Sequence, residues 1–354
     1  MDKVKDIYFR ADSSVDIGTG HIMRCLTLAD VLRKRGLNIH FICRKYKGNI
    51  NHIIEKRGYI VHGLPPRIMN KTDMLLTEEI LKKENRRPDL LVSDHYGIDA
   101  SWESHIKGCV RRVMVIDDFT SRRHHCDLLL NQNLYRNMEK RYKGMVPEGC
   151  RMLLGAKYIL LREQFLPLRK KQKQFNKDVK RILVFVGGTD PTNETMKALK
   201  AIELLNRDDI LIDVVVGVTN PNKDTIKKVC ALMPNARYYC QVDNIEELLF
   251  KADMAIGSGG SASWERCFIG VPSIIMSFAD NQREISENLH REGIAINLGW
   301  YEEITSEDIA VAIRGLMNNP AKRMKMISKG KNIVDGKGAY RVADAIQKMG
   351  EEKE

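Results

Sequence analysis

The sequence predicts an α/β protein made of two domains, each built around a doubly wound parallel sheet. Short apolar runs alternate with amphipathic helical patterns, which is the rhythm of such sheets. The alternation stops in a basic, polar segment at residues 164–180 and restarts at residue 181, and a length of 354 residues suits two domains. We therefore expect an N-terminal domain at residues 1–163, a linker at 164–180 and a C-terminal domain at 181–354.

In the first domain, short apolar runs predict strands, and patterns of helical spacing between them predict helices. The expected strands are residues 4–10, 38–43, 59–62, 89–93, 112–116 and 127–130, and the expected helices are residues 22–34, 72–84 and 100–107. Because a helical pattern follows most of these strands, the sequence predicts parallel pairing with crossover connections.

The second domain repeats this order. The expected strands are residues 181–186, 210–216, 237–240, 254–257 and 273–276; the expected helices are residues 224–232, 245–250, a helix that opens at 261–263, residues 282–291, and most of 304–350. Ligands of parallel sheets bind outside the carboxyl ends of the strands. Two such Rossmann-like domains facing a cleft form the GT-B arrangement, which enzymes of nucleotide sugars use.

The charge of the chain argues against nucleic acid as a partner. The net charge is +12, but residues 162–181 contain eight basic and two acidic residues, so half of the excess lies in one short polar segment around the expected linker. The sequence also lacks the mixture of aromatic and basic residues that nucleic-acid-binding modules carry. The remaining charge favours an anionic substrate or weak contact with an acidic membrane surface.

No apolar run reaches 18 residues and the N-terminus is charged, so we expect a cytoplasmic protein without a transmembrane segment. The eight cysteines are scattered without C-x-x-C spacing, which predicts reduced thiols and no structural zinc. His124 and His125 precede Cys126 but lack a second pair of ligands. We expect neither a metal nor a cofactor.

The loop at residues 18–24 (GTGHIMR) follows the first expected strand and opens the first helix. A helix start carries unpaired amides and partial positive charge, which bind anions and favour a neutral histidine that can act as a base. We therefore expect His21 to be catalytic and Gly18, Thr19 and Gly20 to contact the substrate. The alternative is a simple turn in which His21 caps the helix or packs.

The loop at residues 257–265 (GSGGSASWE) is the strongest phosphate signal in the sequence. Its glycines let the backbone approach a ligand, its serines supply hydroxyl donors, and the following helix supplies free amides. Glu265 lies one turn into that helix, where it can accept hydrogen bonds from a ribose or can be a surface or capping residue. The residues expected to hold a diphosphate are Gly259, Gly260, Ser261 and Ala262.

Several other polar residues follow strands. The backbone of Gly187 and Gly188 can meet a ligand, whereas Asp190 reads as a helix cap with Pro191 at the first helical position. Asp280 and Asn281 can likewise cap a helix or reach a ligand. A second group consists of carboxylates, Asp94, Asp117 and Asp118, which lack the D-x-D spacing of a metal site beside a diphosphate; we expect the last two to cap and bond loops.

Taken in order, these motifs resemble the UDP-sugar hydrolases of the pseudaminic-acid pathway. The matching segments are 10–14 (RADSS), 17–24 (IGTGHIMR), 94–97 (DHYG), 117–118 (DD), 125–133 (HCDLLLNQN), 161–165 (LREQF), 187–190 (GGTD) and 281–282 (NQ). Each motif alone is weak, whereas the ordered set is specific and covers most of residues 4–295. The related spore-coat polysaccharide biosynthesis proteins share several of the motifs.

The resemblance implies a GT-B fold and hydrolysis of UDP-2,4-diacetamido-2,4,6-trideoxy-β-L-altropyranose to UDP and free sugar. It implies that His21 is the catalytic histidine, with Tyr96 and Asn281 orienting the water or the sugar. We expect attack opposite the diphosphate, so that the reaction inverts the anomeric centre without a metal. Further substrate contacts are expected from Asp12, Arg24, Arg162 and Gln282, although Asp12 and Arg24 can instead position the loop.

One segment departs from the hydrolase pattern. Residues 257–261 are more glycine-rich than the family's loop and are similar to the loop of the lipid-II-forming glycosyltransferase. Three functions therefore stay open: a hydrolase, a GT-B glycosyltransferase that uses a UDP-sugar donor, and a nucleotide-sugar-binding protein without catalysis.

Overall fold

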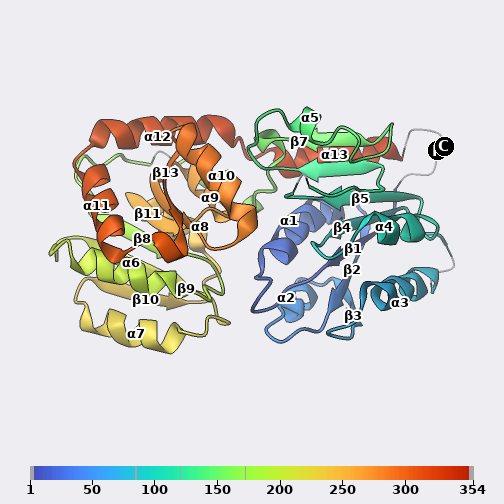
Figure 1. The fold of residues 1–354 in the computed structure, drawn as a ribbon, viewed down its shortest axis with the longest axis horizontal. Coiled ribbons are helices and arrows are strands. Elements are labelled where there is room, and N and C mark those ends of the chain that lie inside the picture. The colour runs from blue at the N-terminus through green and yellow to red at the C-terminus, as the bar shows by residue number, and fades with distance from the viewer. Residues whose placement is uncertain (1–3, 84–85, 120, 172, 351–354) are drawn as a thin grey trace. The chain divides into compact units, whose positions relative to one another are not determined.

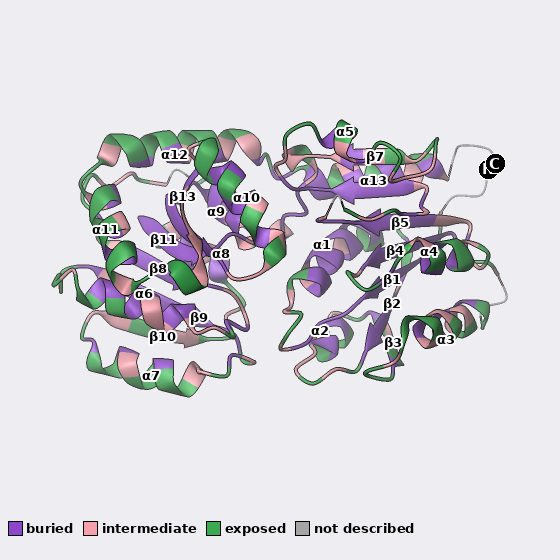
Figure 2. Ribbon diagram, in the orientation of Figure 1, coloured by how far each residue is buried: buried purple, intermediate pink, exposed green. Residues whose placement is uncertain are grey.

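The computed structural model describes residues 4–83, 86–119, 121–171 and 173–350, which form two compact units (Figure 1). Among these residues, unit 1 contains 4–161 and 337–350, and unit 2 contains 162–336. Each unit has a parallel sheet, and Figure 2 shows that the inner strands of each sheet are buried for most of their length, whereas the edge strands β3, β7, β10 and β13 are more exposed. The fold class predicted from the sequence, two Rossmann-like parallel-sheet domains, is confirmed.

Unit 1 contains a seven-stranded sheet in the order β3-β2-β1-β4-β5-β6-β7. Its elements are β1 (Asp6–Ala11), α1 (Gly20–Lys34), β2 (Asn38–Arg44), α2 (Asn51–Lys56), β3 (Ile60–Leu64), α3 (Asn70–Lys82), β4 (Leu90–Asp94), α4 (Ala100–Lys107), β5 (Arg112–Ile116), β6 (Leu128–Asn131), α5 (Met138–Arg141), β7 (Arg151–Leu154), the 3-10 turn Ala156–Tyr158 and α13 (Gly338–Met349). The strand order reverses between β1 and β4, which makes the loops after these two strands the expected ligand site of the sheet.

Continuous apolar runs form the central strands because both faces of the sheet are covered. On one face, Ile7 and Phe9 pack in a core that includes residues of α1 and α13. On the other face, Tyr8 and Leu91 pack in a second core with Trp102 of α4. Alternate residues of β1 therefore enter different cores, which fixes the register of the strand.

Unit 2 contains a six-stranded sheet in the order β10-β9-β8-β11-β12-β13. Its elements are the 3-10 helix η2 (Glu163–Arg169), β8 (Arg181–Phe185), α6 (Glu194–Glu203), β9 (Leu211–Val216), α7 (Lys223–Leu232), β10 (Ala236–Cys240), α8 (Ile245–Lys251), β11 (Met254–Ser258), α9 (Ala262–Ile269), β12 (Ser273–Ser277), α10 (Asp280–Arg291), β13 (Ala295–Trp300), the 3-10 turn Tyr301–Glu303, α11 (Ser306–Met317) and α12 (Pro320–Ile333). Here the order reverses between β8 and β11, so the loops after these strands flank the switch point.

The structure divides the chain differently from the sequence in two places. Residues 337–350 belong to unit 1 instead of the C-terminal domain, because α13 buries its apolar stripe against α1 and Arg35 bonds to Gln347 (Nη1–Oε1, 2.7 Å). The expected linker at 164–180 belongs to unit 2, where Phe165 is fully buried and Arg169 bonds to the carbonyl of Phe268 (3.1 Å). Gln172 of that segment lies outside the described residues.

Some individual elements also differ from the sequence prediction. The elements α2, α5, β7 and β13 were not expected, and the helix expected at 72–84 is α3, with Glu84 outside the described residues. Asp190 does cap α6, accepting the amides of Glu194 and Thr195 at 2.9 Å each. Pro191, however, precedes the helix by three residues, so it does not occupy the first helical position.

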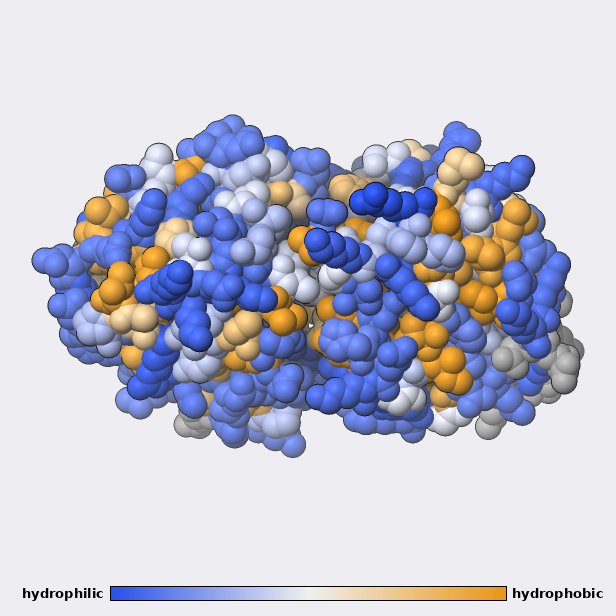
Figure 3. All heavy atoms as spheres, turned by 90° about the horizontal axis from the view of Figure 1, so that it is seen from below, coloured by the Kyte–Doolittle hydropathy of each residue, from blue (hydrophilic) through white to orange (hydrophobic). Residues whose placement is uncertain are grey.

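Exposed hydrophobic side chains are scattered over the described surface. In the described ranges, the structure contains no helix of the length and apolarity needed to span a bilayer. Figure 3 shows a face that is mostly hydrophilic with smaller hydrophobic groups dispersed over it. The exposed large hydrophobic residues are likewise spread over several elements: Ile17, Ile60, Met69, Leu75, Tyr96, Leu204, Val218, Leu232, Val311, Met324 and Tyr340.

A buried histidine ties α4 to the loop before β6. His124 Nδ1 lies 2.8 Å from Glu103 Oε1 and its Nε2 lies 3.7 Å from Asp117 Oδ2, with no exposed side-chain surface. Burial by itself lowers the pKa of His124, but the carboxylates of Asp117 and Glu103 outweigh this effect and raise the pKa to about 9. The histidine is therefore charged in the folded protein at neutral pH.

We predict that this ion pair makes the stability of the protein depend on pH. Since the folded pKa exceeds the ordinary value of about 6.5, its contribution is complete below pH 6.5 and disappears as the pH rises through 9. Urea unfolding should show that the stability gap between wild type and His124→Gln narrows by about 3 kcal/mol from pH 6 to pH 10. A constant gap for His124→Gln would mean that its ring is neutral in the fold.

Candidate functional site

The loops at the switch point of unit 1 bring an imidazole against a carboxylate. His21 is the second residue of α1, Asp94 ends β4, and His21 Nδ1 lies 2.6 Å from Asp94 Oδ1. Asp94 is fully buried and His21 retains 7% of its surface. Burial disfavours ionisation of Asp94, but the charge of Arg24 and the hydrogen bonds from Arg24 and His21 hold its pKa well below the usual range. A buried carboxylate therefore meets a nearly buried histidine.

This contact determines the tautomer of His21. An ionised carboxylate accepts hydrogen bonds and donates none, so Nδ1 carries the proton that Asp94 receives. Arg24 Nη2 lies 3.3 Å from the same Nδ1, but the shorter contact with Asp94 takes precedence. In the neutral ring, Nε2 is then unprotonated and can accept a proton, as a general base must.

Arg24 connects the dyad to a second carboxylate. Its Nε and Nη2 atoms bind the two oxygens of Asp94 at 2.6 Å each, and its Nη1 binds Asp118 Oδ1 at 2.8 Å. Asp118 also accepts hydrogen bonds from Tyr96 Oη (2.6 Å) and Asn133 Nδ2 (2.7 Å). All three guanidinium nitrogens of Arg24 are held by carboxylates, which favours the alternative role, positioning of the loop, over a contact with substrate.

Tyr96 lies beside His21, in agreement with the grouping of D-H-Y-G and G-T-G-H loops expected from the sequence. The two rings are 4.5 Å apart with edge-to-face geometry, and Tyr96 is 37% exposed. Burial and the neighbouring Asp118 raise the pKa of Tyr96 far above its usual value, so the phenol keeps its proton. Sequence reasoning missed Asp94 and Asp118 as partners of these groups, although Asp94 ends β4 and Asp118 is the second residue after β5.

Asp12 lies in a separate buried network below the loop. It forms a bidentate pair with Arg10 (2.7 and 3.0 Å) and accepts bonds from the amide of Arg44 (2.7 Å) and from His95 Nε2 (3.0 Å). Asp73 binds the same two arginines. The side chain of Asp12 has no exposed surface, which favours the alternative role, positioning of the loop at the end of β1, over a contact with substrate.

The loop before α1 has the shape that the sequence suggested. Gly18 adopts φ +80°, a conformation that favours glycine, and its amide bonds to Ser14 O at 3.0 Å. Thr19 precedes the helix without a side-chain cap, and Gly20 is exposed at its first residue. Gly18, Thr19 and Gly20 thus remain accessible beside His21.

At the switch point of unit 2, the loop between β11 and α9 presents backbone donors. The amide of Gly259 bonds to Met276 O (3.1 Å), and Ser263 and Trp264 bond back to Gly260 and Ser261. Among the described residues, the amides of Gly260, Ser261 and Ala262 have no acceptor. Three free amides at the positive end of a helix can bind an anion, so the geometry is compatible with the diphosphate site that the sequence predicts here.

Other expected contacts of unit 2 surround this loop. Glu265 Oε1 pairs with Arg162 (2.8 Å from Nη2), which leaves Oε2 without a bond in the described structure. Gln282 Oε1 accepts the amide of Phe278 (3.2 Å), and Gln282 Nε2 lies near Gly260, 3.7 Å from where a Cβ would stand. Asn281 lies in the first turn of α10, so it does not precede the helix as a cap.

The loop after β8 follows the strand that lies next to β11 in the sheet. Gly187 has φ +153°, and the carbonyl of Gly188 would clash with any Cβ on Gly217, which shows how closely the β8 and β9 loops approach. In the segment that follows these glycines, Asn193 Oδ1 and Thr195 Oγ1 are buried without a hydrogen-bond partner, whereas Glu194 Oε2 lies 2.9 Å from Lys197 Nζ. This edge of the sheet therefore has unused hydrogen-bonding capacity.

Comparison with solved structures identifies the type of fold. MurG of Acinetobacter baumannii has a TM-score of 0.68 at 13% identity, covering 98% of this chain and 100% of that one. TcCGT1 in complex with UDP has a TM-score of 0.69 at 12% identity, covering 98% and 99%. The chain has a GT-B type fold. Within it, residues 181–345 match the glycosyltransferase family 28 C-terminal domain.

Relatives of this GT-B protein confirm the resemblance drawn from the motifs. It is 28% identical over 290 residues to the UDP-2,4-diacetamido-2,4,6-trideoxy-beta-L-altropyranose hydrolase of Campylobacter jejuni, covering 82% of this chain and 98% of that protein. It is 25% identical over 348 residues to the spore coat polysaccharide biosynthesis protein SpsG of Bacillus subtilis, covering 97% and 98%. An uncharacterized protein of Methanocaldococcus jannaschii is 27% identical over 281 residues, covering 77% of this chain and 56% of that protein, so the chain spans little more than half of this relative.

The GT-B units contain no cluster suited to a metal in the described ranges, where no three His, Cys, Asp or Glu side chains gather as ligands. His124, which the sequence raised as a zinc ligand, is instead held by Glu103 and Asp117.

We predict that Gly259→Ala disturbs the amide-bearing loop of the GT-B fold. A Cβ at this position would stand 1.8 Å from Ser286 Oγ and 3.1 Å from Ser286 Cβ, so the loop or α10 must shift. Calorimetric titration with UDP should show affinity reduced by roughly tenfold, since a small displacement spoils three aligned donors. Ser286→Gly removes the obstacle and should restore much of the affinity in the double variant. Unchanged affinity in the single variant would exclude this loop as the UDP site.

Proposed function

We propose that this protein hydrolyses a UDP-linked diacetamido-trideoxy sugar to UDP and the free sugar, in the cytoplasm, during biosynthesis of a nonulosonic acid such as pseudaminic acid. The observation that carries the proposal is the contact of 2.6 Å between His21 Nδ1 and Asp94, which leaves Nε2 as the basic atom. Similarity to the Campylobacter jejuni hydrolase along 98% of that protein supports the choice of substrate.

In this proposal, unit 2 binds the nucleotide. The free amides of residues 260–262 bind the diphosphate, with Gly259, Gly187 and Gly188 allowing its close approach. Glu265 accepts hydrogen bonds from the ribose through Oε2, while Arg162 fixes Oε1. Gln282 contributes its Nε2 group beside Gly260.

Unit 1 supplies the chemistry. Nε2 of His21 takes a proton from water as the water oxygen attacks the anomeric carbon. The bond between that carbon and the diphosphate oxygen breaks, and its electron pair leaves with UDP. Amides aimed at the diphosphate stabilise the growing charge, so the leaving group needs neither an added proton nor a metal. Attack opposite the leaving group inverts the anomeric centre.

Tyr96 and Asn281 are proposed to orient the reacting molecules. The ring of Tyr96 packs edge-on against His21, and its hydroxyl donates to Asp118. Asn281 is half-buried at the start of α10, next to Gln282. A contact of the sugar or the water with these two side chains would fix the line of attack.

Transfer to an acceptor is the second candidate, because residues 181–345 match a glycosyltransferase family 28 C-terminal domain. The experiment is incubation with a panel of UDP-sugars without any acceptor, followed by NMR. Hydrolysis gives UDP and free sugar, with the first-formed anomer inverted. UDP release only when an acceptor is added would identify a transferase instead, and UDP binding without turnover would identify a binding protein.

A further inference from the structure

Arg266 of α9 lies buried beneath the amide-bearing loop of unit 2. It is 3% exposed, and its Nη2 donates to Ser258 O (2.6 Å) and Ser263 Oγ (2.8 Å). Its Nε is buried without any partner. Neither acceptor carries a formal charge, and among the described residues no carboxylate forms an ion pair with Arg266. Glu265, its neighbour in sequence, is paired with Arg162 instead.

The other buried arginines of the protein are compensated. Arg10 binds Asp12 and Asp73, and Arg24 binds Asp94 and Asp118. Arg323, also without a carboxylate, donates to three backbone carbonyls, including Leu316 O near the C-terminal end of α11, where the helix dipole is negative. Arg266 differs from all of these. The residue itself is in the last turn of α9, but its guanidinium reaches back to Ser258 O and Ser263 Oγ at the start of the helix, where the dipole adds to its charge instead of opposing it.

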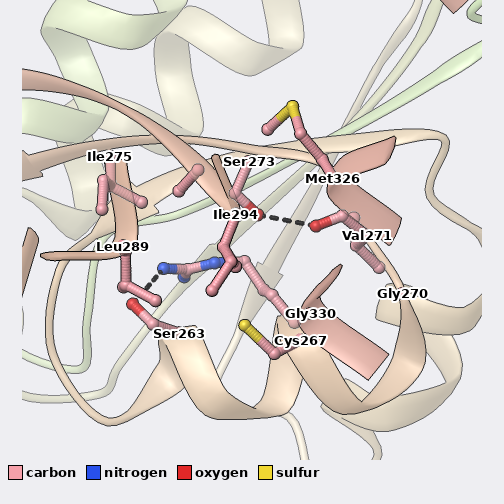
Figure 4. Close-up of a pocket in the computed structure, with 12 residues that line it drawn as sticks. Ser263, Cys267, Gly270, Val271, Ser273, Ile275, Leu289, Ile294, Met326 and Gly330 are labelled. Carbon is pink, nitrogen blue, oxygen red and sulfur yellow. Dashed lines mark hydrogen bonds between the residues drawn. The ribbon is translucent and has the colours of Figure 1, made fainter. Parts of the chain in front are cut away.

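The surroundings of Arg266 offer little solvent to screen this charge. A narrow cavity of about 10 Å³ lies next to it, lined by Ser263, Cys267, Leu289 and Met326 among others (Figure 4). That space holds about one water molecule and is far too small for a nucleotide. Burial lowers the pKa of Arg266 to about 10, which still leaves it charged at neutral pH. A buried, unpaired charge is costly, and a bound anion would reduce that cost.

We propose that Arg266 is a positioning residue for the diphosphate. It holds the loop through its bonds to Ser258 and Ser263, and the negative charge of a diphosphate bound to that loop offsets the charge of the buried guanidinium. The inference builds on the proposed function, because it assumes that residues 260–262 bind the diphosphate of UDP. It adds that the free protein keeps an uncompensated charge under this loop. Selectivity for UDP over uridine then depends on the charge of Arg266 as well as on the amides.

The experiment compares Arg266→Gln, which keeps hydrogen-bond donors but loses the charge, with Arg266→Lys, which keeps the charge. Calorimetry with UDP, uridine and inorganic pyrophosphate gives the ratio of UDP to uridine affinity. We expect Arg266→Gln to lower this ratio at least tenfold with uridine unchanged, and Arg266→Lys to keep it within about threefold. Arg323→Gln, which removes another buried arginine of unit 2, should destabilise the protein and leave the ratio unchanged.

A simple structural role would lower stability in both Arg266 variants without separating UDP from uridine, and that result would overturn the inference. If Arg266→Gln does not fold, NMR of the arginine side chains in the wild type decides, with Arg266→Lys identifying the signal. UDP and pyrophosphate should shift the Arg266 resonance and uridine should not; no shift would refute the inference. Pyrophosphate binding that depends on Arg266 without UDP-sugar turnover would refute the proposed function alone.

Discussion

Replacing His21 by glutamine should lower kcat for UDP-sugar hydrolysis by roughly 10²–10⁴-fold, the usual contribution of a positioned base. Glutamine can still bond to Asp94 from the first turn of α1, so the frame of Arg24 and Asp94 should survive. It has no nitrogen that accepts a proton at neutral pH. The affinity for UDP should stay unchanged, because the free amides that we assign to UDP belong to unit 2.

The matched control is His52→Gln, which makes the same substitution at an exposed histidine of α2 in the same unit. Steady-state kinetics should show wild-type kcat for this control, and calorimetry should show equal UDP affinity for both variants. Turnover of His21→Gln within a few-fold of wild type would remove this histidine from the mechanism. A loss of UDP affinity in both His21→Gln and His52→Gln would instead indicate that the substitutions change the folding of the protein.

Sequence patterns located the main loops because parallel sheets place their ligand sites after strands. The loops containing His21, Tyr96 and Gly259 were all expected, and each follows a strand near a switch point. The partners of these groups were not predicted, since Asp94 and Asp118 come from different strands and only the strand order brings them to Arg24. Without that order, a lone aspartate reads as a metal ligand or a cap.

The same limit explains the errors in the fold. Apolar runs marked most strands of both sheets, but a helical pattern does not reveal which sheet the helix covers. Hence α13 was placed in the second domain, although it packs on α1. The charged segment at 164–180 was read as a linker because its buried residues, such as Phe165 and Leu168, are few among many lysines.

Replacing Asp94 by asparagine should be nearly as damaging as the loss of His21, with kcat reduced by roughly 10²–10⁴-fold. Asp94 Oδ1 accepts the proton of His21 Nδ1, and this bond fixes which ring nitrogen is free. The amide group of asparagine donates hydrogen bonds, so it can stabilise the opposite tautomer, in which Nε2 carries the proton and cannot act as the base. Pre-steady-state kinetics should locate the loss in the chemical step, with UDP affinity unchanged.

Asp118→Asn is the control that separates an effect on the tautomer of His21 from the effect of losing one negative charge in the network. Asp118 also binds Arg24 and is buried, but it is bonded to Tyr96 and Asn133 and has no bond to His21. Both variants remove one negative charge from the same network, so urea unfolding should show comparable losses of stability. Only Asp94→Asn should lose most of its turnover. Equal loss of turnover in both variants would mean that the network acts through its net charge, and that Asp94 does not select the tautomer of the base.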